Sequence, residues 1–193
     1  MIIFDKLVNK ILRIYVQLNF HMEGIMSLED LNLSPNDAHE HAQTTDYFDL
    51  IKLLYKLRVK GKTIVDLGCG TGSALAIFSF FKFKKIYGVE LSGKLAEIAK
   101  KNFSQYKKME IIHSDARSFY KTVDFVFMFN PFPLNVVFEC IENIIKCNRG
   151  SVFIYRNPIF IEDIKNQYKN YYVEKFSWNT INSRYVIFYL TTG

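Results

Sequence analysis

The 193-residue sequence has little cysteine, little proline and no long apolar run. Its three cysteines are too few and too irregularly spaced for a disulfide framework or a metal site, so we expect a cytoplasmic protein without a bound metal. Charged residues interrupt residues 1–20, which therefore do not resemble a secretory signal. No segment approaches the roughly 18 apolar residues that a membrane-spanning helix requires.

Acidic residues are outnumbered by basic ones. The sequence has 25 Lys and Arg against 19 Asp and Glu, which gives a formal charge of +6. The lysines are spread along the chain, with short clusters at 82–85 and 100–108, and we interpret them as solvated helix faces and turns. Only a clustered basic face beside the functional site would favour a nucleic-acid partner.

The N-terminal part differs from the rest. Residues 2–20 place apolar side chains at helical spacing, which predicts one amphipathic helix. We expect residues 1–43 to form a flap of helix and loop, ahead of one domain at 44–193. The helix could pack on this domain, join a second copy in a homodimer, or make a peripheral contact with a membrane surface. Thr44 or Thr45 is expected to cap a further helix that runs to about Leu57.

From Lys62 onward, short apolar runs alternate with helical patterns. The runs lie at 63–67, 86–89, 109–112, 123–129 and 151–155, and the helical patterns at 73–81, 92–105, 135–147 and 159–168. This alternation predicts an α/β domain with a mostly parallel, doubly wound sheet covered by helices on both faces. The runs 171–176 and 185–191 are joined by a segment too short for a helical crossover, which predicts an antiparallel hairpin at the sheet edge.

A glycine-rich segment, Val65-Asp66-Leu67-Gly68-Cys69-Gly70-Thr71-Gly72, ends the first strand and opens a helix. Glycines allow a tight turn and a close approach of the backbone to a ligand. The G-x-G-x-G spacing differs from the dinucleotide motif, and no Gly-Lys-Ser/Thr follows for a phosphate loop. Asp66 would repel a pyrophosphate, but it suits a ligand that carries an amino group.

Two further acidic residues stand at the ends of the next two strands. Glu90 follows the glycine loop by about twenty residues, a position from which a carboxylate can bind both ribose hydroxyls. Asp115, after the third strand, can accept a hydrogen bond from an adenine amino group. With Asp66, the three acids predict a site for a nucleoside that carries an amino group.

Asp66–Gly72, Glu90 and Asp115 together resemble the cofactor site of the class I S-adenosylmethionine-dependent methyltransferases, over roughly residues 44–191. The resemblance implies a seven-stranded sheet of order 3-2-1-4-5-7-6, with strand seven antiparallel, and S-adenosylmethionine as cofactor. It also implies three groups of contacts: the glycine loop on the methionine part, Glu90 on ribose, and the strand-three acid on adenine. The residues concerned are Asp66, Gly68, Cys69, Gly70, Gly72, Glu90, Leu91, Asp115 and Ala116.

The segment Phe129-Asn130-Pro131-Phe132-Pro133 follows the fourth strand, across the crevice from the glycine loop. It is similar to the Asn/Asp-Pro-Pro-aromatic motif of amino-methylating class I enzymes, although Phe132 replaces the second proline and Pro133 the aromatic residue. We therefore expect Asn130, Pro131 and Phe132 at the acceptor site, with Asn130 as the catalytic candidate. Asn157, in a second Asn-Pro pair after the fifth strand, is expected at the same edge.

The two Asn-Pro pairs and the stretch from Leu31 to Thr44 also resemble a group of poorly characterised bacterial methyltransferases. This likeness implies that the loop His39–Thr44 closes over the cofactor, with Thr44 as a contact and His41 near the acceptor. The sequence thus predicts methyl transfer to a small-molecule, sugar or glycan acceptor. Two alternatives stay open: a protein or nucleic-acid amino-methyltransferase, and a cofactor-binding subunit without catalysis.

Overall fold

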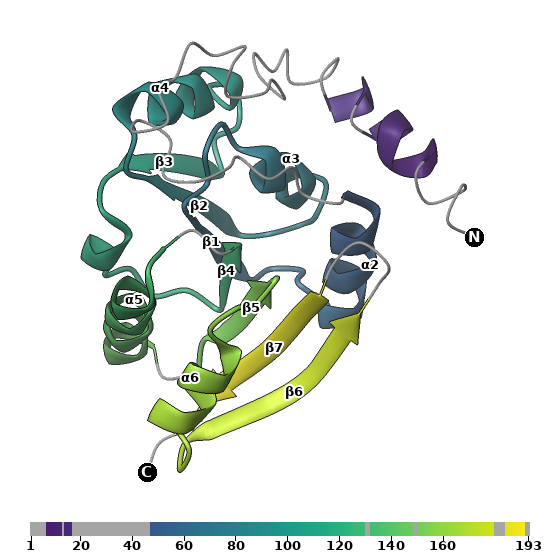
Figure 1. The fold of residues 1–193 in the computed structure, drawn as a ribbon. Coiled ribbons are helices and arrows are strands. Elements are labelled where there is room, and N and C mark those ends of the chain that lie inside the picture. The colour runs from purple at the N-terminus through teal and green to yellow at the C-terminus, as the bar shows by residue number, and fades with distance from the viewer. Residues whose placement is uncertain are drawn as a thin grey trace.

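The computed structural model describes residues 7–12, 14–16, 47–129, 132–148, 150–179 and 184–191. The predictions for Thr44, His41, Asn130 and Pro131 lie outside these residues. Within them, strands and helices alternate along the chain and build one twisted sheet with helices on both faces (Figure 1).

The sheet has the predicted strands in the predicted order. The strands are β1 (Thr63–Leu67), β2 (Lys85–Glu90), β3 (Met109–His113), β4 (Phe125–Phe129), β5 (Val152–Arg156), β6 (Tyr172–Asn179) and β7 (Arg184–Leu190). Their order is β3-β2-β1-β4-β5-β7-β6. Strands β1 to β5 pair in parallel, whereas β7 is antiparallel to both β5 and β6. The doubly wound α/β class and the antiparallel hairpin are confirmed.

The helices lie close to where the sequence periodicity predicts them. They are α2 (Tyr47–Leu57), α3 (Ser73–Ser79), α4 (Gly93–Asn102), α5 (Leu134–Cys147) and α6 (Ile161–Gln167), with a short 3₁₀ turn η1 (Ala116–Ser118). Residues 7–12 and 14–16 are also helical and are called the N-terminal helix below. None of the helices in the described part of the chain is long and apolar enough to cross a membrane.

Two hydrophobic cores sandwich the sheet. One joins the sheet to α2 and α3 and includes Val16 of the N-terminal helix, and the other joins it to α5 and α6. Strands β4 and β5 are buried along nearly their whole length because helices cover both of their faces. In β6, which lies at the sheet edge, half-buried side chains are interspersed with exposed ones.

The N-terminal helix packs on the domain through only part of its apolar surface. Val16 is fully buried, and Asn9 Oδ1 accepts a hydrogen bond from Phe48 N at 3.0 Å, which satisfies a free amide in the first turn of α2. At helical spacing, Leu7 and Ile11 lie on the side of the helix away from Asn9 and Val16, and both are exposed. Much of the predicted apolar stripe therefore faces away from the domain.

The parallel arrangement gives the sheet two chemically different edges. The carboxyl ends of β1 to β5 meet at one edge, which we call the carboxyl edge, and the segments that lead into these strands meet at the opposite amino edge. Each helix between consecutive parallel strands runs from the carboxyl edge back to the amino edge. The glycine loop and all three acids singled out above thus belong to the carboxyl edge.

Candidate functional site

The glycine loop forms a tight turn between β1 and α3. Gly68 N and Cys69 N both donate to Val89 O, at 2.8 Å and 3.0 Å, and this holds the start of the loop against β2. Gly68, Gly70 and Gly72 have φ values of 79°, 55° and 100°. Residues other than glycine rarely adopt such φ values. The backbone path of this turn therefore favours glycine at all three positions of the G-x-G-x-G motif.

Gly72 also has a packing role, because a Cβ atom built at this position overlaps the ring of Phe103. At Gly70, by contrast, an added Cβ meets open space. Cys69, between them, is buried beside Gly88 and fills space, and burial raises the pKa of its thiol well above the usual range. A thiol of this kind is not a nucleophile.

These two glycines form a matched pair for mutation. Gly72→Ala is expected to lower the free energy of unfolding by about 2 kcal/mol more than Gly70→Ala, because it adds a clash with Phe103 to the backbone strain. Urea denaturation of the two variants would measure the difference. Equal destabilisation would mean that backbone conformation alone requires glycine at both positions.

Glu90 is held in place by backbone amides from two different segments. Its Oε2 accepts a hydrogen bond from Gly70 N at 2.8 Å, and its Oε1 accepts one from Ser92 N at 2.9 Å. Ser92 in turn caps α4, where its side chain accepts from Leu95 N. The carboxylate at the end of β2 is therefore oriented in advance, between the glycine loop and the start of a helix.

Asp66 is the most perturbed acid of the site. It is only 3% exposed at the end of β1, and no described residue donates a hydrogen bond to its carboxyl group. Burial, and secondly the charge of Glu90, raises the pKa of Asp66 to about 8. The group is therefore protonated at neutral pH in the ligand-free protein, and a cationic ligand group beside it would favour ionisation.

Asp115 is paired with an arginine that the sequence analysis did not single out. Its Oδ1 accepts from Arg117 N at 2.8 Å, which caps η1, and its Oδ2 accepts from Arg117 Nη2 at 2.6 Å. These hydrogen bonds from Arg117 lower the pKa of the Asp115 carboxyl. Arg117 Nη1 also lies 3.6 Å from a Glu139 carboxylate oxygen on α5, which fixes the pair relative to the helix.

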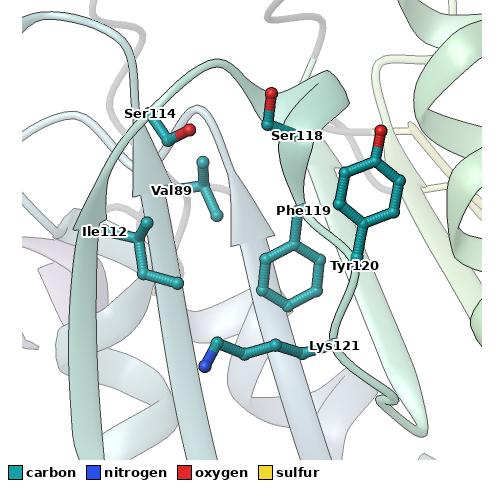
Figure 2. Close-up of a pocket in the computed structure, with 7 residues that line it drawn as sticks. All are labelled: Val89, Ile112, Ser114, Ser118, Phe119, Tyr120 and Lys121. Carbon is teal, nitrogen blue, oxygen red and sulfur yellow. The ribbon is translucent and has the colours of Figure 1, made fainter.

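A pocket of about 280 Å³ lies beside this acid, on the α5 face of β2 and β3. Figure 2 shows strand side chains on one side of it, the η1–β4 segment on the other, and two serines near one end. The lining residues are Val89, Ile112, Ser114, Ser118, Phe119, Tyr120 and Lys121. None of them was predicted as a site residue, but Val89 precedes Glu90 and Ser114 precedes Asp115. Leu91, which was predicted, is 54% exposed.

The ends of β4 and β5 form the other side of the carboxyl edge. Phe132 is half-buried against the α5 core. Asn157 has a φ of 45°, its N donates to Arg184 O at 2.7 Å, and its Oδ1 accepts from Arg184 N at 3.2 Å. Its side chain thus ties β5 to β7, a contact that sequence spacing does not reveal. Arg156 is buried, with its guanidinium carbon 4.1 Å from the centroid of the Phe129 ring.

The described residues contain no group of three or more His, Cys, Asp or Glu side chains that could hold a metal ion. His113 is exposed at the end of β3, with its Nε2 3.1 Å from Leu91 O. The groups that the described part of the site offers to a ligand are carboxyl groups and the backbone of the glycine turn. A protonated buried acid, an oriented carboxylate and an apolar pocket fit the amino group, ribose and base of a nucleoside cofactor.

Known proteins resemble this chain in fold. Residues 64–147 match the family described as methyltransferase domain. A candidate RNA methyltransferase from Pyrococcus horikoshii has the same fold, with a TM-score of 0.70 and 16% identity, over 92% of this chain and 98% of that one. The ribosomal protein L11 methylase of Lactobacillus delbrueckii aligns at a TM-score of 0.61 and 15% identity, over 79% and 81% of the two chains.

Magnesium protoporphyrin IX methyltransferase from Synechocystis, solved with bound S-adenosylmethionine, aligns at a TM-score of 0.60 and 16% identity, over 75% of this chain and 78% of that one. A comparison with curated protein sequences found no match. The chain has the seven-stranded sheet of the class I methyltransferases, and residues 64–147 match a methyltransferase domain. It is an S-adenosylmethionine-dependent enzyme.

Proposed function

We propose that this methyltransferase acts on a small-molecule, sugar or glycan acceptor bound at the carboxyl ends of β4 and β5. The observation that carries the proposal is the distribution of charge. Asp66, Glu90 and Asp115 surround the cofactor side of the carboxyl edge, while Arg117 there is already paired with Asp115. A polyanionic acceptor such as RNA needs a basic surface beside the site, and the lysines gather instead at the amino edge.

In this proposal the cofactor is bound by the residues whose geometry is given above. Asp66 faces the amino group, Glu90 the ribose, and Leu91 with the pocket beside Asp115 the adenine ring. S-adenosylmethionine, when bound, supplies a methyl group already activated by the sulfonium. The protein then has to align the acceptor and exclude water, and alignment of this kind contributes up to roughly 7–11 kcal/mol.

The acceptor can be sought with labelled cofactor. Purified protein would be incubated with sugars, small amines and separate small-molecule, glycan, RNA and protein fractions of a cell extract. We expect label in the small-molecule or glycan fraction. Label that enters only RNA or protein would reject this acceptor class, and no transfer to any fraction despite cofactor binding would favour a non-catalytic subunit.

Asn130 is the candidate for orienting the acceptor, on the strength of its motif after β4. Asn130→Ala is expected to leave cofactor affinity nearly unchanged and to lower turnover about tenfold or more, equivalent to roughly 1.4 kcal/mol or above. The measurement compares turnover on the identified acceptor with the dissociation constant for S-adenosylhomocysteine. Wild-type turnover per folded molecule would remove Asn130 from the site and leave it a turn residue.

A further inference from the structure

Basic side chains gather at the amino edge of the sheet, although they are spread along the sequence. The segments that lead into β1, β2 and β3 all enter from this edge, and each of them carries lysine or arginine. We call these side chains the basic edge: Arg58, Lys60, Lys62, Lys82, Lys84, Lys85, Lys107 and Lys108. The parallel arrangement of the strands brings to one edge lysines that lie in separate turns of the sequence.

Backbone hydrogen bonds connect the segments of the basic edge directly. Gly61 N donates to Lys82 O at 2.7 Å, Lys84 N donates to Lys62 O at 2.7 Å, and Ile86 N donates to Lys108 O at 2.9 Å. Because neighbouring strands lie only about 4.8 Å apart, side chains from these segments share one continuous surface.

Few negative charges offset this surface. Glu110 pairs with Lys85 and Lys121, and Asp124 pairs with Lys62. The other six basic side chains are exposed and form no ion pair with any described residue. The amino edge therefore carries a concentrated positive potential, on the side of the sheet opposite Asp66 and Glu90.

An exposed apolar surface adjoins the basic edge. Tyr15 lies at the end of the N-terminal helix, and the centroid of its ring is 5.7 Å from that of Phe80. Phe80 precedes Lys82 by two residues. Leu7, Ile11 and Ile14 continue along the outward face of this helix, and each is about half exposed. Their spacing places them on one face. Figure 1 shows the helix (purple) outside α2 and α3.

We propose that the basic edge and the outward face of the N-terminal helix together bind the surface of an anionic lipid membrane. Lysines attract acidic headgroups, and apolar side chains of a surface-lying helix enter the boundary between headgroups and acyl chains. A nucleic acid would satisfy the lysines and stack on aromatic rings, but it leaves Leu7, Ile11 and Ile14 without a partner. A second copy packed on the same face would bring two sets of positive charge together.

This surface is independent of the acceptor proposed above, because it lies at the opposite edge of the sheet. Binding through the amino edge leaves the carboxyl edge accessible to cofactor and acceptor. Affinity for S-adenosylhomocysteine is therefore expected to be unchanged in variants of this surface, and that affinity also serves as their folding control.

The experiment is sedimentation of the full chain with vesicles of phosphatidylcholine, with and without phosphatidylglycerol, at low salt. The protein is expected to bind only the anionic vesicles. The triple variant Lys82→Gln, Lys84→Gln, Lys108→Gln should reduce the partition coefficient about 100-fold, since each lysine near an anionic surface contributes about 1 kcal/mol. The matched control, Lys52→Gln, Lys94→Gln, Lys175→Gln, removes the same charge from positions away from the amino edge and should bind nearly as wild type.

The double variant Ile11→Gln, Ile14→Gln tests the apolar part. It should lose the binding that persists in wild type at high salt, where charge attraction is screened. Equal losses in the two lysine triples would overturn the proposal, since net charge alone would then explain binding. Absence of binding to anionic vesicles would also overturn it, as would RNA binding that depends on the basic edge without vesicle binding, or dimerisation that the Ile11 and Ile14 changes abolish.

Discussion

Replacing Asp66 with asparagine is expected to stabilise the ligand-free protein near pH 8 and, at the same time, to weaken cofactor binding. The folded-state pKa is about 8, whereas the ordinary value is 3.8. Between these two pH values the folded protein keeps a proton that the unfolded chain has lost. The contribution of Asp66 to the free energy of unfolding therefore falls as pH rises from about 4 to about 8, and it levels off above that.

Asparagine has nearly the same shape as aspartate and carries no charge at pH 4 or at pH 8. The variant therefore does not lose stability between these two pH values as the wild type does. We expect a gain of about 2–4 kcal/mol near pH 8 and almost none near pH 4, measured by urea denaturation of both proteins. Asp124→Asn is the matched control, and its effect on the free energy of unfolding at pH 8 should have the opposite sign. The Asp124 carboxylate accepts hydrogen bonds from Thr63 N and Lys62 Nζ, so its loss should destabilise the protein at pH 8. A pH-independent effect of Asp66→Asn would contradict the raised pKa.

The same substitution tests the role proposed for Asp66 in the cofactor site. In wild type, the affinity for S-adenosylhomocysteine should rise with pH up to about 8, by as much as about tenfold per unit, because Asp66 must lose its proton before it can pair with an ammonium group. In Asp66→Asn the affinity should be at least about tenfold lower at pH 7 and its pH dependence much flatter. Calorimetric titration at several pH values measures both. An unchanged affinity would place the amino group elsewhere.

Removal of the Glu90 carboxylate is expected to cause the largest loss of cofactor affinity. Glu90→Ala should raise the dissociation constant for S-adenosylhomocysteine about 100-fold, and Glu90→Gln about tenfold, because hydrogen bonds to a charged group contribute about 1.5–3 kcal/mol each. The alanine variant also leaves Gly70 N and Ser92 N without their acceptor, which loosens the glycine loop. Calorimetry gives the two constants, and Glu97→Gln on the exposed surface of α4 is the control.

A second readout separates the charge of Glu90 from its hydrogen bonds. The negative charge of Glu90 contributes to the raised pKa of Asp66. In Glu90→Gln, the pH at which cofactor affinity levels off should therefore move below about 8. A dissociation constant that stays at the wild-type value in Glu90→Ala would show that the ribose site is misplaced, whatever the stability of the variant.

Periodicity and motif spacing predicted the scaffold accurately. β1 occupies the predicted residues 63–67, and α5 (Leu134–Cys147) begins one residue before the prediction. Such patterns are local. A strand that helices cover on both faces is a run of apolar residues, and a helix that packs on a core has apolar residues that recur every 3.6 positions. The three glycines at positive φ could also be anticipated, because the tight turn after a strand restricts which residues fit.

Contacts between distant segments could not be predicted in this way. Arg117 pairs with Asp115 two residues before it, and the fold also sets its guanidinium beside Glu139 of α5, which the sequence did not indicate. Asn157 is predicted at the acceptor edge, and in the structure its side chain contacts Arg184, 27 residues further along the chain. Both contacts depend on which elements are neighbours in space, which a one-dimensional pattern does not encode.

The sequence by itself determined the class of fold, the positions of the strands and the glycine turn after β1, because each follows from local chemistry along the chain, whereas the order of the strands came from the resemblance to the class I methyltransferases. Only the tertiary structure decided the electrostatics. Burial beside Glu90 turns Asp66 into an acid with a pKa of about 8. Parallel pairing brings the lysines before β1, β2 and β3 to one edge, away from that acid. Both effects depend on distance and solvent exposure, and folding sets these for residues that are far apart in the chain.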